Sequence, residues 1–305
     1  MNTIRKAAID IGSNTTLFLV GDVDGEGKIE IVEEDCVINS IGKDVFHSGR
    51  ISSNTIQRNI QILLELISKA SCSGVEKVIV AGTAALRKAS NAAEFTREVF
   101  ESLGLELRIL SEEEEARLSY LGYLSGKNAL VGDILLIDIG GGSVEFIKAG
   151  GGDVGESFSL ELGAVKLLDK FQLGDPPDAG KFRRMERFVE AELSKTGLTD
   201  MELMNETVIL SGGTASALAA VKMGLVYYRP DAVEGVILEK GWIEGMEAGL
   251  LETNIEQRRR MLNFEPDRAA VIIEGTLIAL KILTILEAGR CSVTHRGVRF
   301  GLLCE

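Results

Sequence analysis

The hydrophobic pattern of the first 125 residues alternates between short apolar runs and stripes with helical spacing. The first three runs predict strands separated by short turns, as in an antiparallel set: 7–10, 16–22 and 28–35. From Ser53 the apolar positions recur at helical spacing, which predicts a helix with one buried face. Residues 36–51 show neither pattern, so we expect a loop there, with His47 on its surface. The remaining expected elements of this half are buried strands at 77–81 and 105–110 and helices at 91–103 and 111–124.

The same plan starts again near residue 134. The strands expected in this half cover 134–137, 144–148, 154–160, 207–210 and 291–294. The expected helices begin at 162, 179, 217, 239, 256 and Pro266, and a short helix ends the chain. The longest apolar segment, 269–288, contains Glu274 and Lys281, so we interpret it as a buried helix and not a membrane span.

The repeated plan predicts an α/β fold made of two related domains. We place them at residues 1–125 and 126–295, with the chain crossing between them near residues 126–128. The last segment, 296–305, is expected to pack back on the first domain. Substrate would then lie in a cleft between the two domains.

Two glycine-containing turns follow buried strands in the same way, one in each half. Asp10-Ile11-Gly12 and Asp138-Ile139-Gly140 share the frame of an apolar run, an aspartate, an isoleucine and a glycine, 128 positions apart. Such turns expose backbone amides that can bind phosphate, although an isolated example can equally be an ordinary β-turn. A third strand–glycine–helix junction follows residue 211. The candidate phosphate-binding residues are Gly12, Ser13, Asn14, Thr15, Gly140, Gly141, Gly142, Ser143, Gly212, Gly213 and Thr214.

Carboxylates stand beside both of the related turns. Asp138 and Glu145 bracket the second glycine turn, and Asp10 precedes the first. Carboxylate oxygens are the ligands that Mg²⁺ prefers in proteins. We therefore predict that these three residues are candidates for holding Mg²⁺ or another divalent cation.

Arg87 and Glu115 are two further candidate site residues, and each stands where a purely structural role is also possible. Arg87 follows a strand end and a loop of small residues, where a guanidinium can bind an anion, but it could also cap a helix or face solvent. Glu115 ends a run of four glutamates after Ser111. Ser111 with Glu114 has the spacing of a capping box, which explains part of the run without any catalytic role. The functional interpretation is that one glutamate of the run is a general base.

Composition narrows the class of protein. The net charge of −13 argues against a non-specific nucleic-acid surface, so a polyanionic substrate would need a metal, loop amides or well-placed arginines. The cysteines form no C-x-x-C pair and predict reduced thiols in a cytosolic protein: Cys36, Cys72, Cys291 and Cys304. The chain reaches its first strand within a few residues, without a signal-peptide pattern.

Taken together, these motifs resemble the duplicated ribonuclease-H-like domains of actin-like ATPases. Within that fold, the chain resembles the exopolyphosphatase/guanosine pentaphosphate phosphohydrolase (Ppx/GppA) family over nearly its whole length, in its short two-domain form. The resemblance rests on the order of the segments 8–15, 82–89 with Asn91, 111–116, 138–145, 162–167, 211–214 and 297–303.

The resemblance implies roles for individual residues. Glu115 takes the place of the family's catalytic glutamate, Asp138 and Glu145 that of its metal-associated pair, and Arg87 that of its motif arginine. The segments Gly12–Thr15 and Gly140–Ser143 take the place of the phosphate loops. Two positions depart from the family pattern: Glu112 stands where glycine is usual, and Val144 where a small hydroxyl residue is common.

The expected activity is Mg²⁺-dependent removal of the terminal phosphate from linear polyphosphate. The close alternative is removal of a phosphate from guanosine pentaphosphate, which needs the same chemistry and a nucleoside pocket. More distant alternatives are an actin-like kinase or ATPase and a non-catalytic sensor of polyphosphate or an alarmone. A homodimer is expected from the resemblance alone, with neither a nucleic-acid nor a membrane partner.

Overall fold

A computed structural model describes residues 3–126, 132–198 and 207–305 of the chain. The chain divides into two compact units. The first contains Met1–Leu130 together with Arg296–Glu305, and the second contains Val131–His295. The expected crossing falls partly on residues 127 and 128, which lie outside the described residues.

The first unit is built on a five-stranded mixed sheet in the order β3-β2-β1-β4-β5. Its strands are β1 (Ile4–Ile11), β2 (Thr15–Val23), β3 (Ile29–Ile38), β4 (Lys77–Gly82) and β5 (Leu107–Ile109). The first three pair antiparallel, as predicted, and β1 pairs parallel with β4. This pairing places the ends of β1 and β4 side by side, with Ile11 opposite Gly82.

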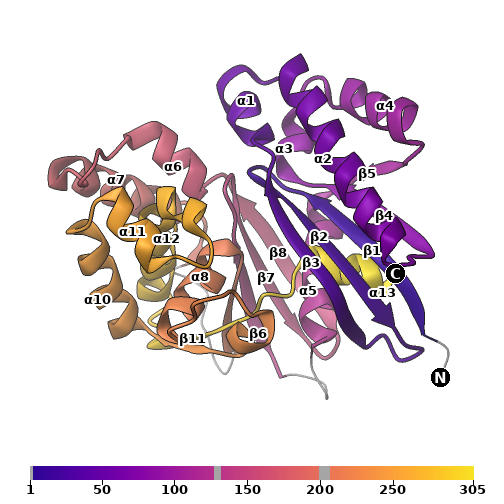
Figure 1. Cartoon of the computed structure of the whole chain (residues 1–305). Coiled ribbons are helices and arrows are strands. Elements are labelled where there is room, and N and C mark those ends of the chain that lie inside the picture. The colour runs from indigo at the N-terminus through magenta and orange to yellow at the C-terminus, as the bar shows by residue number, and fades with distance from the viewer. Residues whose placement is uncertain (1–2, 127–131, 199–206) are drawn as a thin grey trace. The chain divides into compact units, whose positions relative to one another are not determined.

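Helices cover both faces of this sheet (Figure 1). They are α1 (Ile41–Ser48), α2 (Ser53–Cys72), α3 (Ala84–Lys88), α4 (Ala92–Leu103), α5 (Glu112–Leu124) and α13 (Val298–Cys304). Helices α1 to α4 pack on one face, in a core that contains Phe18, Leu63 and Phe95. Helices α5 and α13 pack on the other face, where Leu118 and Phe300 are fully buried. The last helix of the chain thus belongs to the core of the first unit.

The second unit repeats this topology with one strand added at an edge. Its six-stranded sheet has the order β10-β11-β9-β6-β7-β8. The strands are β6 (Ile134–Ile139), β7 (Val144–Gly150), β8 (Asp153–Leu160), β9 (Thr207–Ser211), β10 (Ile237–Glu239) and β11 (Arg290–Val293). Strands β6, β7 and β8 pair antiparallel, and β6 pairs parallel with β9. The predicted α/β fold with two related domains is therefore confirmed.

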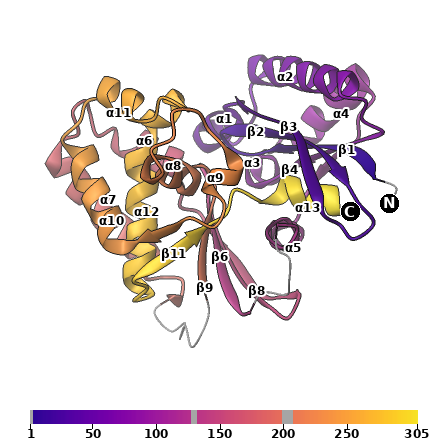
Figure 2. The same ribbon diagram turned by 60° about the horizontal axis from the view of Figure 1, so that its bottom comes forward.

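The helices of the second unit share one large apolar core. They are α6 (Ala164–Phe171), α7 (Ala179–Leu193), α8 (Gly213–Lys222), α9 (Pro230–Val233), α10 (Lys240–Leu251), α11 (Ile255–Met261), the 3-10 helix η2 (Pro266–Ala270) and α12 (Ile272–Ile285). Helix α12 runs beside α8, and α8 contacts β11 (Figure 2). Helix α12 is buried along nearly its whole length, which explains its continuous apolar sequence.

The structure corrects several predicted elements. The expected loop at 36–51 contains helix α1, whose N-cap Ser40 has a left-handed φ of 61°. This short helix is fixed from outside itself, since Gly42 donates a 2.6 Å hydrogen bond to the Ser13 carbonyl. Strand β10 was missed because its three residues are too few to show a period.

The apolar segment after Pro266 also differs from its prediction. A single helix from Pro266 was expected, but η2 ends at Ala270 and α12 begins at Ile272. The prediction that the segment is buried is correct. Among the described residues, no helix combines the length and hydropathy that crossing a membrane requires.

Candidate functional site

In the first unit, the turn between β1 and β2 is closed by its own backbone. The amide of Gly12 donates to the Thr15 carbonyl at 2.9 Å. A Cβ at Gly12 would lie 3.1 Å from the same oxygen, so any larger residue would crowd the turn. Asp10 lies just before the turn and is 8% exposed. The predicted phosphate residues Gly12–Thr15 thus form one tight turn at the end of a buried strand.

Residues 39–42, which the sequence did not identify as part of the site, hold this turn through hydrogen bonds to its carbonyls. Asn39 is fully buried, and its Nδ2 donates to the Gly12 carbonyl at 2.9 Å. Its backbone amide donates to the Asn14 carbonyl at 2.9 Å, and Gly42 binds the Ser13 carbonyl. Three successive carbonyls are therefore held by residues 39–42. The sequence signal for this anchor is weak because it is one buried asparagine inside an apparent loop.

Arg87 and Glu115 lie together in the first unit. Arg87 Nη1 contacts Glu115 Oε2 at 2.5 Å and also donates to the Leu110 carbonyl at 3.0 Å. Glu115 is 8% exposed, and the Arg87 side chain is 17% exposed. The structure therefore excludes the alternative that Arg87 merely faces solvent. Glu112, which departs from the family pattern, lies at the edge of this pair, 4.0 Å from Arg87 Nη2.

The capping box and the candidate base are different residues. Ser111 and Glu114 bond each other reciprocally, at 2.8 Å and 3.1 Å, which confirms the predicted box. Glu115 is the next residue but turns inward to Arg87. Glu115 is thus a buried carboxylate that contacts a guanidinium and takes no part in the capping box of its helix.

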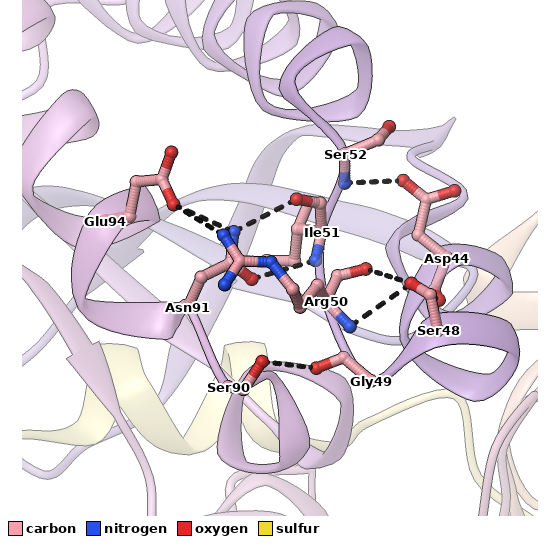
Figure 3. Close-up of polar contacts among 9 residues, drawn as sticks. All are labelled: Asp44, Ser48, Gly49, Arg50, Ile51, Ser52, Ser90, Asn91 and Glu94. Atoms are coloured by element: carbon pink, nitrogen blue, oxygen red, sulfur yellow. Dashed lines mark hydrogen bonds and ion pairs between the residues drawn. The ribbon is translucent and has the colours of Figure 1, made fainter.

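Asn91, one of the motif residues, has a structural role (Figure 3). Its Oδ1 accepts from the Ile51 amide at 2.9 Å, and its Nδ2 donates to the Ile51 carbonyl at 3.0 Å and to Glu94 at 3.1 Å. Nearby, Ser90 Oγ donates to the Gly49 carbonyl at 2.9 Å. These bonds tie the start of α4 to the link between α1 and α2.

In the second unit, the turn between β6 and β7 repeats the closure of the first. The Gly140 amide donates to the Ser143 carbonyl at 2.9 Å, the same bond as in the first unit. The carbonyls of Gly140 and Gly141 accept from the first amides of α6, at 3.1 Å from Ala164 and 2.9 Å from Val165. A Cβ on Gly163 would lie 2.3 Å from the Gly141 oxygen. This close approach gives the physical reason for glycine at position 163.

Asp138 and Glu145 are direct partners across β6 and β7. Residues opposite each other in an antiparallel pair point to the same face of the sheet, so their carboxylates are neighbours. Ser159 Oγ donates to Glu145 Oε1 at 3.2 Å. Burial raises the pKa of Asp138 to about 6, and the Ser211 hydroxyl offsets part of this effect. A neighbouring cation would stabilise the ionised form of this carboxylate.

These two carboxylates fit Mg²⁺ better than a cation that needs a full cage of protein ligands. Among the residues described, no group of three or more His, Cys, Asp or Glu side chains could hold a metal. Mg²⁺ is commonly bound by one or two carboxylates, with waters and substrate phosphates completing its octahedron. The pair at Asp138 and Glu145 matches that donor set. Asp10 lies in the other unit, opposite Leu17 on β2.

The third glycine junction lies beside this carboxylate pair. Gly212 has a φ of +91°, and a Cβ there would lie 2.7 Å from Asp138 Oδ1. Gly213 opens helix α8, and a Cβ on it would overlap the guanidinium of Arg268, 1.6 Å from Nη1. The sequence did not identify Arg268 as a site residue, because no motif surrounds it. It lies in a short stretch of charged residues before an apolar helix. Thr214, by contrast, is 6% exposed, and its hydroxyl packs against α12 at Gly275.

Comparison with known proteins identifies the family of this chain. The model of the Ppx/GppA phosphatase family matches residues 20–305. A crystal structure of the Aquifex aeolicus member of the Ppx/GppA protein family is 32% identical, with a TM-score of 0.83 over 99% of this chain and 97% of that one. Exopolyphosphatase 1 of Mycobacterium bovis is 25% identical over 301 residues, 98% of this chain and 87% of its own length.

An exopolyphosphatase from Cytophaga hutchinsonii shares the fold, with a TM-score of 0.85 over 97% of this chain and 96% of its own, at 20% identity. The family match covers residues 20–305, which include the Arg87–Glu115 pair, the second glycine turn and the Asp138–Glu145 pair, whereas the first glycine turn lies before it. The resemblance inferred from the sequence is thus confirmed, and the chain belongs to the Ppx/GppA phosphatase family.

Proposed function

We propose that this protein hydrolyses the terminal phosphoanhydride bond of linear inorganic polyphosphate and releases orthophosphate. The observation that carries the proposal is the buried Glu115 carboxylate, which Arg87 orients and which lies outside the capping box of its helix. A protein that only bound its ligand would need no such base. The name of the Mycobacterium relative supports polyphosphate as the first substrate to test.

The proposed reaction is an in-line attack by water on the terminal phosphorus. Glu115 takes a proton from the attacking water, the new P–O bond forms, and the bond from phosphorus to the bridging oxygen breaks. The products are orthophosphate and a chain that is one phosphate shorter. Phosphoryl transfer depends mainly on positioning and charge stabilisation, which suits a site built from amides and a few charged side chains.

The glycine turns would hold the phosphate oxygens. The Gly12 and Gly140 amides close the turns, so the donors for this role would be the amides of Ser13 and Asn14, those of Gly141 and Gly142, and the amino end of α8 at Gly213. Arg268, which lies beside Gly213 at the amino end of α8, and Arg87, which lies beside Glu115, would add guanidinium groups to these donors. Asp138 and Glu145 would hold Mg²⁺, which when bound would neutralise charge on the transferred phosphate.

A phosphate-release assay with matched glutamine variants tests the base. Glu115→Gln removes the proton acceptor and keeps the size of the side chain, so we expect turnover to fall about 10²–10⁴-fold. Glu113→Gln is the matched control, because Glu113 lies in the same helical turn but is exposed. Near-normal turnover by the Glu115 variant would refute the assignment.

The same assay ranks the substrates. Wild-type protein is compared on polyphosphates of several lengths, on guanosine pentaphosphate and on ATP with added acceptor, each with and without Mg²⁺. We expect the highest kcat/KM on polyphosphate and dependence on a divalent cation. Higher kcat/KM on guanosine pentaphosphate would replace the proposed substrate, and phosphate transfer from ATP to an acceptor would replace the reaction class.

A further inference from the structure

The exposed side of helix α7 in the second unit carries three arginines, Arg183, Arg184 and Arg187. The last of them stands at i+4 from the first and at i+3 from the second, so all three lie on one side of the helix. Phe182 and Met185, on its other side, are buried in the core of the unit. Like charges at these spacings destabilise a helix, and the chain as a whole has a net charge of −13. The stability of the helix therefore does not explain this cluster of positive charge.

The acidic residues around these arginines are already engaged. Among the residues that the structure describes, none of the three arginines forms an ion pair. Glu186 and Glu190 have the spacing to pair with them, but both bind Lys281 of α12 instead, at 2.7 Å and 2.6 Å respectively. Asp178 lies near Arg184, but its carboxylate serves as the N-cap of α7. The guanidinium groups are thus available to an anion from outside the helix.

Helix α6 connects this side of α7 to the second glycine turn. The two helices lie side by side (Figure 1). Lys166 is in the first turn of α6, where its amide donates to the Gly141 carbonyl at 3.2 Å and its side chain pairs with Glu161 at 3.3 Å. Lys170 follows at i+4 on the same side of the helix, and its Nζ lies 4.8 Å from the centre of the Phe188 ring on α7. Positive side chains thus lead from the turn along α6 to α7.

We propose that Lys170, Arg183, Arg184 and Arg187, together called the basic surface, bind the internal phosphates of a long linear polyphosphate. The terminal phosphate of that chain lies at the second glycine turn, so the proposal rests on the proposed function for its substrate. From the first residue of α6, Ala164, to Lys170 the helix rises about 9 Å. A long chain held at the turn reaches the basic surface, whereas tripolyphosphate held there falls short of the arginines on α7.

The chemistry of the basic surface favours a phosphate chain over a nucleic acid. Proteins that bind single strands without sequence preference stack the bases on aromatic rings. Phe188 is the aromatic residue next to these arginines, but its ring packs on Phe171, with 5.5 Å between the ring centres, and Lys170 lies over it. The ring is therefore covered where a base would stack. Cations on an exposed surface suit a flexible chain in which every internal phosphate is charged.

Equilibrium binding of long-chain polyphosphate, measured with a chelator present so that no divalent cation is available, tests the proposal. The test variant combines Arg183→Gln, Arg184→Gln and Arg187→Gln, all at exposed positions. We expect its affinity to be about 10- to 100-fold lower than that of the wild type, because three surface charge contacts are lost together. Equal affinities of the two proteins, or no binding by the wild type, would overturn the proposal.

A control variant separates the basic surface from the net charge. Lys28→Gln, Lys77→Gln and Arg97→Gln together remove the same charge from exposed positions of the first unit. This variant should bind like the wild type, because distant exposed charges are screened at physiological salt. A loss as large as in the test variant would contradict a local binding surface.

Two further measurements identify what the basic surface recognises. Lysine at the three arginine positions keeps the charge, so that variant should retain binding. The affinity of the wild type should fall more steeply with added salt than that of the test variant, since fewer charges are then screened in the variant. Single-stranded DNA that displaced polyphosphate at an equal concentration of phosphate would overturn the choice of ligand.

Phosphate release distinguishes this proposal from the proposed function. In the test variant, kcat/KM on long chains relative to tripolyphosphate should fall about 10-fold, since the basic surface contacts only long chains. Equal changes on both substrates would overturn the link between the basic surface and the turn. If no polyphosphate is hydrolysed but the test and control variants still differ in binding, the proposed function fails and the binding surface stands.

Discussion

Asn91 shows how one buried side chain can fix a neighbouring backbone. It satisfies both the amide and the carbonyl of Ile51, in a part of the first unit where Asn91 is 6% exposed and Ile51 is 3% exposed. We expect Asn91→Ala to lower the free energy of unfolding by about 1–3 kcal/mol, because it leaves both backbone groups buried without a partner. Urea denaturation measures this loss.

Ser90→Ala is the control for that change. Ser90 is the neighbouring residue and also bonds backbone, at Gly49, but that bond is exposed. A loss in the Ser90 variant as large as in the Asn91 variant would contradict the argument from burial.

Asp138 links stability, pH and metal binding. Its pKa is raised from 3.8 to about 6 by burial, so between these pH values the folded protein keeps a proton that the unfolded chain has released. Stability in the absence of metal should therefore fall as pH rises from about 4 to 6, by up to about 3 kcal/mol. Mg²⁺ needs the ionised carboxylate, so its affinity should rise over the same window.

Urea denaturation and Mg²⁺ titration across pH 4–7 check both expectations. Asp138→Asn should remove the contribution of this carboxyl to each profile, whereas Asp153→Asn, at an exposed position on β8, should leave both unchanged. A Mg²⁺ affinity with the same pH profile in wild type and the Asp138 variant would show that the metal binds elsewhere.

Among the elements, the contact between α6 and the second glycine turn is the most sensitive to added volume. A methyl group on Gly163 would meet the Gly141 carbonyl oxygen at 2.3 Å. We expect Gly163→Ala to displace the turn, to lower stability by about 1–3 kcal/mol and to raise the KM for the phosphate substrate. Thermal unfolding and phosphate-release kinetics provide the two measurements.

Gly155→Ala is the matched control on β8. A Cβ there meets its nearest neighbour, the Lys148 carbonyl, at 3.5 Å, which is ordinary contact. If both glycine variants behaved like wild type, the turn would be able to give way and the proposed rigidity of this contact would be wrong.

For the molecule as a whole, the order of the chain does not match the order of its compact units. Residues 296–305 belong to the first unit although 165 residues of the second unit, 131–295, precede them. Within the first unit, α13 packs so tightly on α5 that a Cβ at Gly301 would lie 2.0 Å from the Leu118 carbonyl oxygen. The last residues of the chain are thus part of the core that holds β1.

We therefore expect Gly301→Ala to destabilise the first unit by about 1–3 kcal/mol through overpacking. Amide hydrogen exchange should show faster exchange in β1 and α5 and little change in the helices of the second unit. Gly297→Ala is the control, since a Cβ there has no neighbour within 4 Å. Faster exchange spread evenly over both units would contradict the assignment of α13 to the first.

The sequence by itself determined the repeated plan. The frame of apolar run, aspartate and glycine at Asp10 and Asp138 recurs because both turns need a buried strand before them and small residues within them. The structure confirms this repetition in the strand order of the two sheets and in the identical closing bonds of the two turns. The Ser111–Glu114 capping box could also be predicted from the sequence, because it depends only on residues of one helical turn.

Tertiary structure alone decided which side chains meet. Arg87 and Glu115 are 28 positions apart, and no local pattern couples them. Asn39 lies just before α1 and Gly42 lies within it, in a segment whose sequence shows no helical periodicity. Both residues matter because they donate hydrogen bonds to the carbonyls of the first glycine turn. Arg268 likewise lies at the candidate site only because its guanidinium packs against Gly213 at the start of α8. Local periodicity specifies strands, turns and caps, whereas contacts between distant residues arise only when the chain has folded.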